Sequence, residues 1–136
     1  MNFALTTFDG KRKKGRIARV HNEGGVLVVS YEALRMYQHL LRRYKWFYVV
    51  LDEGHKIKNP RCQVTEAVKA VEASNRLILS GTPIQNSLEE LWSLFDFIEP
   101  GALGSLGAFR GNYCAHIRKA GLAGASFYEV RLHFHD

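Results

Sequence analysis

The sequence predicts an α/β fold in which a parallel sheet is flanked by helices. Three short apolar runs alternate along the chain with three segments whose apolar residues recur at the helical period of about 3.6 residues. Alternation of strand and helix in this order is typical of parallel sheets with right-handed crossovers. Because 46% of the 136 residues are hydrophobic, the chain also has enough apolar side chains for a packed core.

The first predicted strand is the β-branched run 26–29, which ends at Ser30. The segment after it places Leu34, Tyr37 and Leu41 on one face of a helix. Ser30 is a residue type that caps helix starts, because its hydroxyl accepts a hydrogen bond from a backbone N–H that has no partner within the helix. We therefore expect this helix to begin directly after Ser30.

The second predicted strand is the continuous apolar run 46–51, which stops abruptly at Asp52-Glu53. A continuous run of this kind is expected of a strand that is buried on both faces of a parallel sheet. Pro60 then breaks the chain, and a second helix follows with the apolar positions Val64, Ala67, Val68 and Val71.

The third predicted strand, 77–79, ends at Ser80 and is followed by a third amphipathic helix. Ser87 and Glu90 have the spacing of a capping box at its start. The apolar positions that define this helix are Leu88, Leu91, Trp92 and Phe95. We expect Trp92 and Phe95 to lie in the core, as well as Trp46. A short helix is expected near 108–117.

Each predicted strand ends in a polar residue, namely Ser30, Asp52 or Ser80. In open parallel sheets, ligands bind beyond the carboxyl ends of the strands. We therefore expect these residues to share one edge of the sheet, with Glu53 and Thr82 beside them. This edge is the predicted functional site.

The residues 52–55 (DEGH) carry two adjacent carboxylates that can serve different purposes. Asp52, at the strand end, can hold Mg²⁺, which prefers oxygen ligands and bridges substrate phosphates. Glu53 can orient or deprotonate an attacking water. The alternative is an acidic pair at the start of a helix, or plain surface charge. The turn 80–83 (SGTP) adds two hydroxyl donors after the neighbouring strand.

Residues 1–25 form a polar segment in which five cations lie close together: Lys11, Arg12, Lys13, Lys14 and Arg16. Either this segment is a solvated loop or it contacts nucleic acid. Lys and Arg number 19 against 13 acidic residues, and the pI is about 9.5, which suits a polyanionic partner. No apolar run approaches the roughly 20 residues of a membrane span, so no membrane association is expected.

Two longer motifs resemble a known family. Residues 48–59 (YVVLDEGHKIKN) resemble motif II of the Snf2 branch of the superfamily 2 helicase-like ATPases, and 77–86 (LILSGTPIQN) resemble its motif III. The continuation 88–98 (LEELWSLFDFI) is typical of this branch, and 26–34 (VLVVSYEAL) is similar to the segment before motif II. Within the family, residues 100–104 (PGALG) and the stretch 114–126 most resemble the Cockayne syndrome group B type, which acts in transcription-coupled repair.

The resemblance implies a partial RecA-like sheet, the ATP-binding first lobe of a DNA-tracking motor, over residues 26–126. Residues 1–25 would be a basic extension, and the tail 127–136 departs from the family pattern. ATP and Mg²⁺ would be the cofactors and double-stranded DNA the partner, with a nucleosome or an RNA polymerase as wider context. The protein would act in the nucleus.

Site roles follow from the resemblance residue by residue. Asp52 would hold Mg²⁺, Glu53 would activate water, and His55 would link the nucleotide to motif III. The residues that couple ATP to DNA and to a second lobe would be Ser80, Gly81, Thr82, Gln85 and Asn86. Ser30 and Tyr31 would lie near the DNA backbone. The charge of the basic N-terminal segment, rather than the resemblance, adds four further candidate DNA contacts: Lys11, Arg12, Lys13 and Lys14.

The sequence contains no G-K-[ST] triplet, so we expect this chain to lack the loop that cradles phosphates. It would then be a fragment, a split gene or a degenerate copy. We expect it to be inactive by itself, because the upstream loop and a second RecA-like lobe are needed for ATP hydrolysis. The alternative function is a non-catalytic remnant that binds DNA or a protein partner. An unrelated basic α/β domain would require both motifs to be coincidence.

Overall fold

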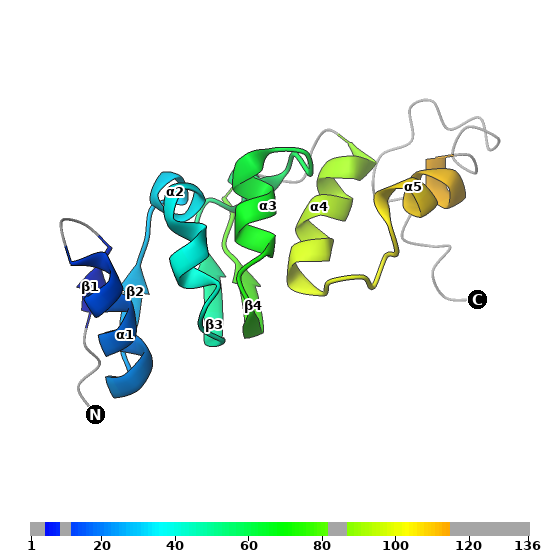
Figure 1. The fold of residues 1–136 in the computed structure, drawn as a ribbon. Coiled ribbons are helices and arrows are strands. Elements are labelled where there is room, and N and C mark those ends of the chain that lie inside the picture. The colour runs from blue at the N-terminus through cyan, green and yellow to red at the C-terminus, as the bar shows by residue number, and fades with distance from the viewer. Residues whose placement is uncertain (1–4, 9–11, 82–86, 115–136) are drawn as a thin grey trace.

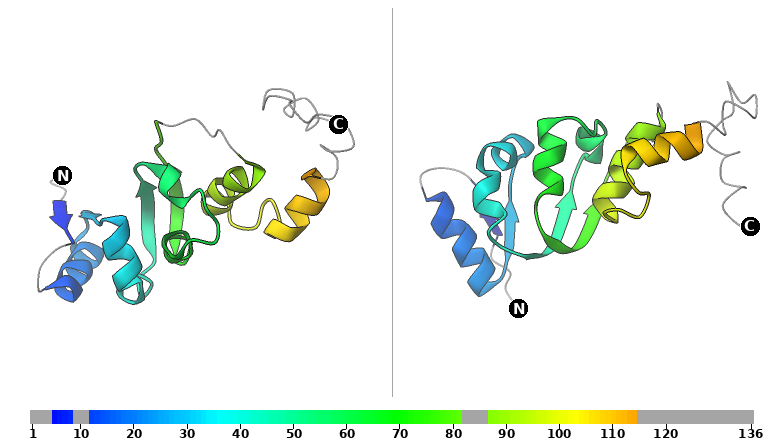
Figure 2. Two further views of the ribbon diagram at one scale, coloured as in Figure 1. Left: turned by 90° about the horizontal axis from the view of Figure 1, so that it is seen from above. Right: turned by 45° about the vertical axis from the view of Figure 1, so that its right-hand side comes forward.

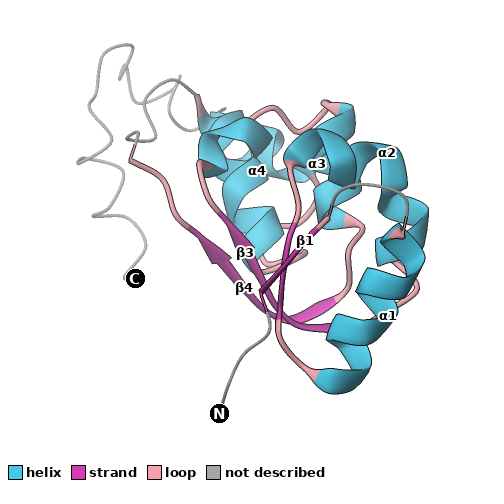
Figure 3. Cartoon of the chain, turned by 90° about the vertical axis from the view of Figure 1, so that its left-hand side faces the viewer, coloured by secondary structure: helices cyan, strands magenta, loops and turns pink. Residues whose placement is uncertain are grey.

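The computed structural model describes residues 5–8, 12–81 and 87–114, and it places the main helices on one face of short parallel strands (Figures 1 and 3). The strands are β1 (Leu5–Thr7), β2 (Val26–Val28), β3 (Trp46–Leu51) and β4 (Ala73–Ile78). The helical elements are α1 (Lys13–Glu23), α2 (Tyr31–Leu41), the 3-10 turn η1 (Gly54–Ile57), α3 (Gln63–Lys69), α4 (Leu88–Ile98), α5 (Leu106–Phe109) and the π-turn η2 (Arg110–Cys114). The predicted α/β class with parallel strands is confirmed.

The strands pair as two parallel couples, β1 with β2 and β3 with β4. The sequence predicted that 26–29, 46–51 and 77–79 would join one sheet. Among the described residues, β2 instead pairs with β1, a strand of three residues that is too short to give a periodic signal. The strand bounds 46–51 were predicted correctly, whereas β4 begins four residues before the apolar run because polar residues at its start still pair with β3.

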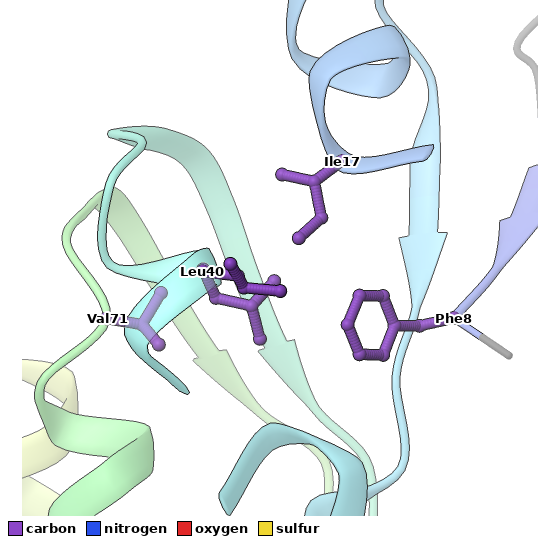
Figure 4. Packing of buried hydrophobic residues seen from close by; sticks show 5 residues of the cluster. Phe8, Ile17, Leu40 and Val71 are labelled. Atoms are coloured by element: carbon purple, nitrogen blue, oxygen red, sulfur yellow. The ribbon is translucent and has the colours of Figure 1, made fainter. Parts of the chain in front are cut away.

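The possibility that residues 1–25 form a solvated loop is wrong over the parts that the structure describes. β1 pairs with β2, and α1 packs with Ile17 and Val20 buried. Phe8 joins Ile17, Leu40 and Val71 in one hydrophobic cluster, seen from close by in Figure 4. Helix α1 was not predicted from the sequence, because five basic side chains stand among its few apolar residues and no clear helical period results. A helix of this composition is stabilised by packing more than by its own propensity.

Helix α2 begins as predicted. Ser30 has an extended backbone, and its hydroxyl accepts a hydrogen bond from the N–H of Ala33 at 3.1 Å. Leu40 and Leu41 are buried, and the predicted face of the helix packs on the same cluster as Phe8. This cap fixes where the chain turns from β2 into α2, and therefore where Tyr31 lies.

Helix α4 buries a different face from the one predicted. Phe95 is 46% exposed, so its expected place in the core is wrong, whereas Ser93 and Phe97 are fully buried. Apolar side chains also lie on the side opposite to the predicted face, at Leu94 and Phe97, so periodicity alone does not select the inner face of the helix. A hydrogen bond from the Ser93 hydroxyl to the carbonyl of Ile57, at 2.7 Å, belongs to the face that is buried. Trp46 and Trp92 are only partly buried.

Strand β3 is covered on one face only, which contradicts the expected burial on both. Leu51 packs into a second cluster with Ile57, Val68, Leu94 and Phe97. On the other face Tyr48, Val50, Leu77 and Leu79 are about half exposed. The two views in Figure 2 show the helices lying along the same side of the strands.

The predicted helix near 108–117 corresponds to α5 and η2 as far as residue 114, and its remainder lies outside the described residues. Within the ranges that the structure describes, the helices are all too short or too polar to cross a bilayer.

Candidate functional site at the carboxyl ends of β3 and β4

The carboxyl ends of β3 and β4 lie side by side, as the sequence predicted. Leu51 is in register with Ile78. The N–H of Leu79 donates to the carbonyl of Leu51 at 2.7 Å, and the N–H of Gly54 donates to the carbonyl of Leu79 at 2.9 Å. Residues 52 and 53 therefore form a two-residue loop between two hydrogen bonds to Leu79. Ser80 follows directly, so Asp52 and Ser80 share one edge.

Glu53 adopts a left-handed backbone conformation, with φ 52° and ψ 51°. It is the one non-glycine residue with a positive φ in the part of the chain that the structure describes. For a residue with a Cβ atom, this conformation costs about 1–2 kcal/mol. It starts the turn η1, since the N–H of Lys56 donates to the Glu53 carbonyl at 3.0 Å. The side chain of Glu53 is 60% exposed, so water can reach its carboxylate.

His55 lies beside Glu53, with its Nδ1 atom 3.1 Å from the Glu53 Oε2 atom. This Nδ1 atom is buried, and the contact does not meet the geometry of a hydrogen bond. The two side chains therefore touch without a directed bond, and the contact becomes an ion pair only when the imidazole is protonated.

Gly54 is required by packing at this position. A Cβ atom added to it would lie 2.2 Å from the Cγ2 atom of Ile78. Because carbon atoms do not approach so closely, only glycine lets η1 pack against β4 while its N–H reaches Leu79. Sequence reasoning did not assign Gly54 a role, although a glycine between two chemically active side chains was a usable signal.

Tyr31 connects the start of α2 to this loop. Its hydroxyl donates a hydrogen bond to the carbonyl of Asp52 at 2.8 Å. Burial of the phenol, followed by the negative charges of Asp52 and Glu53, raises the pKa of Tyr31 to about 12. The hydroxyl therefore remains a donor throughout the physiological pH range. The structure thus brings Tyr31 to the edge that carries the carboxylates, whereas the bonds of Ser30 are to α2, which it caps.

Helix α4 supports the same turn from the other side. Ser93, fully buried, donates to the Ile57 carbonyl at the end of η1, and Lys58 lies 3.5 Å from the carboxylate of Glu90. Sequence reasoning missed Ser93, because a serine within an apolar helix gives no signal of which neighbour its hydroxyl reaches.

The predicted basic contacts belong to the other end of the molecule, around α1 (Figure 1). The Lys13 ammonium lies 4.7 Å from the ring centroid of Tyr37, and the Arg16 guanidinium donates to the Thr7 carbonyl at 2.8 Å. Arg12 and Lys14 are exposed. Four other predicted site residues lie outside the described residues: Lys11, Thr82, Gln85 and Asn86. Gly81 is described and exposed.

The donor set at residues 52 and 53 fits Mg²⁺. Both residues are exposed, and one oxygen of Asp52 accepts from the Glu53 N–H at 2.9 Å, which orients the carboxylate. Magnesium is usually bound by one or two carboxylates with water and substrate phosphates completing its shell. Over the described ranges no group of three or more His, Cys, Asp or Glu side chains could hold a metal by itself.

Comparison with known proteins agrees with this architecture. The chain matches the SNF2-related domain over residues 2–130. It is 47% identical to the DNA excision repair protein ERCC-6 of Homo sapiens over 88% of this chain and 8% of that protein. It is also 47% identical to the DNA repair and recombination protein RAD26 of Saccharomyces cerevisiae, over 85% of this chain and 11% of that protein.

A solved structure shows the same fold. The SWI2/SNF2 ATPase core of Sulfolobus solfataricus in complex with dsDNA superposes with a TM-score of 0.75 at 30% identity, covering 96% of this chain and 26% of that chain. The fold is thus that of a part of a RecA-like ATPase core. The chain belongs to the SNF2-related domain family. It spans about a tenth of the length of the two curated relatives.

Proposed function

We propose that this chain forms part of the ATP-binding lobe of a DNA-dependent ATPase of the Snf2 type. The observation that carries the proposal is the pair Asp52-Glu53, which protrudes from the end of β3 beside Ser80 with both residues exposed. A metal-binding carboxylate and a water-orienting carboxylate at one strand end are what phosphoryl transfer to water needs.

In this proposal Asp52 would hold Mg²⁺, and its carboxylate is already oriented by the Glu53 N–H. When bound, magnesium supplies charge neutralisation at the phosphate oxygens of ATP. Glu53 accepts a hydrogen bond from the attacking water and aligns it with the terminal phosphate. His55, in contact with the Glu53 carboxylate, would link the nucleotide to motif III, residues 77–86.

Double-stranded DNA is the proposed partner, and the nucleus the proposed compartment. The solved relative is described as a complex with dsDNA, and the two similar curated proteins are named for DNA repair. Ser30 and Tyr31 would contribute to the DNA side, and Ser80, Gly81, Thr82, Gln85 and Asn86 to coupling between ATP and DNA. Arg12 and Lys14 are exposed cations that would contact the DNA backbone.

The test is Glu53→Gln in a longer chain that adds a phosphate-binding loop and a second RecA-like lobe. We expect DNA-stimulated phosphate release to be lost while ATP affinity stays within a few-fold of the wild type, because the amide keeps the shape of the side chain but is a poor base. Glu99→Gln, which neutralises an exposed glutamate after α4, is the matched control. Near-normal turnover of the Glu53→Gln protein would contradict the proposal.

A further inference from the structure

The peptide plane between Asp52 and Glu53 is held at both of its ends. Its carbonyl, which belongs to Asp52, accepts a hydrogen bond from the Tyr31 hydroxyl at 2.8 Å. Its N–H, which belongs to Glu53, donates to the Asp52 carboxylate at 2.9 Å. The carboxylate bond is made by the loop itself, whereas the tyrosine reaches in from α2, 21 residues earlier in the chain.

The orientation of this plane decides the conformation of Glu53. The φ of Glu53 is 52°, a value that side chains with a Cβ atom rarely adopt. Turning the plane over by about half a rotation would bring φ into the ordinary negative range, because the two flanking dihedrals are the soft rotations of the chain. The relaxed conformation is therefore one peptide flip away, and some interaction must oppose the flip.

The ladder on either side of the loop does not oppose it. The bonds from Leu79 to Leu51 and from Gly54 to Leu79 hold the residues before and after the loop, and they leave the plane between Asp52 and Glu53 free to rotate. A flip would break both bonds to this plane: the one from the Glu53 N–H to the Asp52 carboxylate, which lies within the loop, and the one from the Tyr31 hydroxyl, which comes from α2. The ring of Tyr31 packs against the cluster of Leu51 and Ile57, so its hydroxyl has a fixed position from which to hold the carbonyl.

We propose that Tyr31 is a positioning residue: its hydroxyl fixes the Asp52–Glu53 peptide plane and so keeps Glu53 in the left-handed conformation that directs its carboxylate. The inference rests on the proposed role of Glu53 in orienting water. A residue at the start of α2 thereby becomes part of the site. The position of this helix start then determines the direction of the Glu53 side chain.

The experiment is NMR on the 136-residue chain, comparing the wild type with Tyr31→Phe. At positive φ the amide proton and the Hα of one residue are close together, so Glu53 in the wild type gives a strong intraresidue NOE. We expect this NOE to fall severalfold in Tyr31→Phe, because the phenylalanine ring keeps the packing but cannot hold the carbonyl.

Tyr37→Phe is the matched control. Tyr37 lies on the same helix and is also half buried, and its ring contacts are with Phe8 and Lys13, far in sequence from the loop. We expect it to leave the Glu53 NOE unchanged. An undiminished NOE in Tyr31→Phe would overturn the inference, and so would an equal decrease in both variants, since that would indicate general loosening.

A titration with MgCl₂, followed through the amide shifts of Asp52 and Glu53, separates this inference from the proposed function. We expect the wild type to bind Mg²⁺ weakly and Tyr31→Phe to bind it severalfold more weakly still. This result would support both the metal role of Asp52 and the positioning role of Tyr31. Absence of any Mg²⁺-dependent shift in the wild type would contradict the proposed metal role of Asp52. The NOE comparison would still decide the inference in that case.

Discussion

Replacing Gly54 with alanine should destabilise the fold through one contact. The new Cβ atom would lie 2.2 Å from the Cγ2 atom of Ile78, well over 1 Å closer than ordinary carbon contacts of about 3.5–4.0 Å allow. Ile78 is β-branched, so its methyl cannot rotate away without leaving its preferred rotamer. The backbone cannot move easily either, because the Gly54 N–H is bonded to Leu79.

Overpacking of this kind costs about 1–3 kcal/mol, and with both partners constrained we expect the upper half of that range for Gly54→Ala. The assay is urea unfolding of the 136-residue chain, followed by tryptophan fluorescence. The free energies of unfolding of the variants and the wild type are compared with the slope m held equal, so that a shift in midpoint reports a change in stability. Gly15→Ala is the matched control. Gly15 lies within α1 and has nothing within 4 Å of its added Cβ, so we expect stabilisation of up to about 1 kcal/mol there.

A double-mutant cycle identifies the contact itself. Ile78→Ala removes the methyl that obstructs the new Cβ, so the double variant should be more stable than the sum of the single changes predicts, by about 1–2 kcal/mol. A cost below about 0.5 kcal/mol for Gly54→Ala would refute the reasoning, since substitutions without a structural conflict fall within that range. Simple additivity in the cycle would show that Ile78 is not the obstacle.

Two further predictions concern DNA and ATP. Arg12→Gln and Lys14→Gln should each weaken duplex DNA binding and lower the slope of log affinity against log salt concentration by about one, because fewer counterions are released. Arg19→Gln is the control and should change this slope less, since the Arg19 guanidinium pairs with Glu23 at 2.9 Å. If titrations at several salt concentrations give unchanged slopes for Arg12→Gln and Lys14→Gln, these two cations do not contact DNA. The 136-residue chain by itself should release no phosphate from ATP with Mg²⁺ and duplex DNA, because no G-K-[ST] segment is present to hold the β- and γ-phosphates; turnover that disappears in Asp52→Ala would contradict this.

The sequence by itself determined the strand–helix order and the place of the carboxylates. The apolar run 46–51 gave β3 its bounds, and Ser30 and Ser87 gave the starts of α2 and α4, because period and capping are local properties. The expectation that Asp52 and Ser80 share an edge followed from parallel pairing alone. The family resemblance, confirmed by the match to the SNF2-related domain, came from the same short motifs.

Only the tertiary structure decided how these elements are held. No local pattern shows that Gly54 must leave room for Ile78, that Ser93 reaches the Ile57 carbonyl, or that α4 exposes Phe95. These depend on distances between segments that lie up to 36 residues apart in the chain. The left-handed backbone of Glu53 is likewise invisible to a local pattern, because glutamate by itself disfavours it, and the hydroxyl that bonds to the preceding carbonyl comes from Tyr31, 21 residues earlier in the chain.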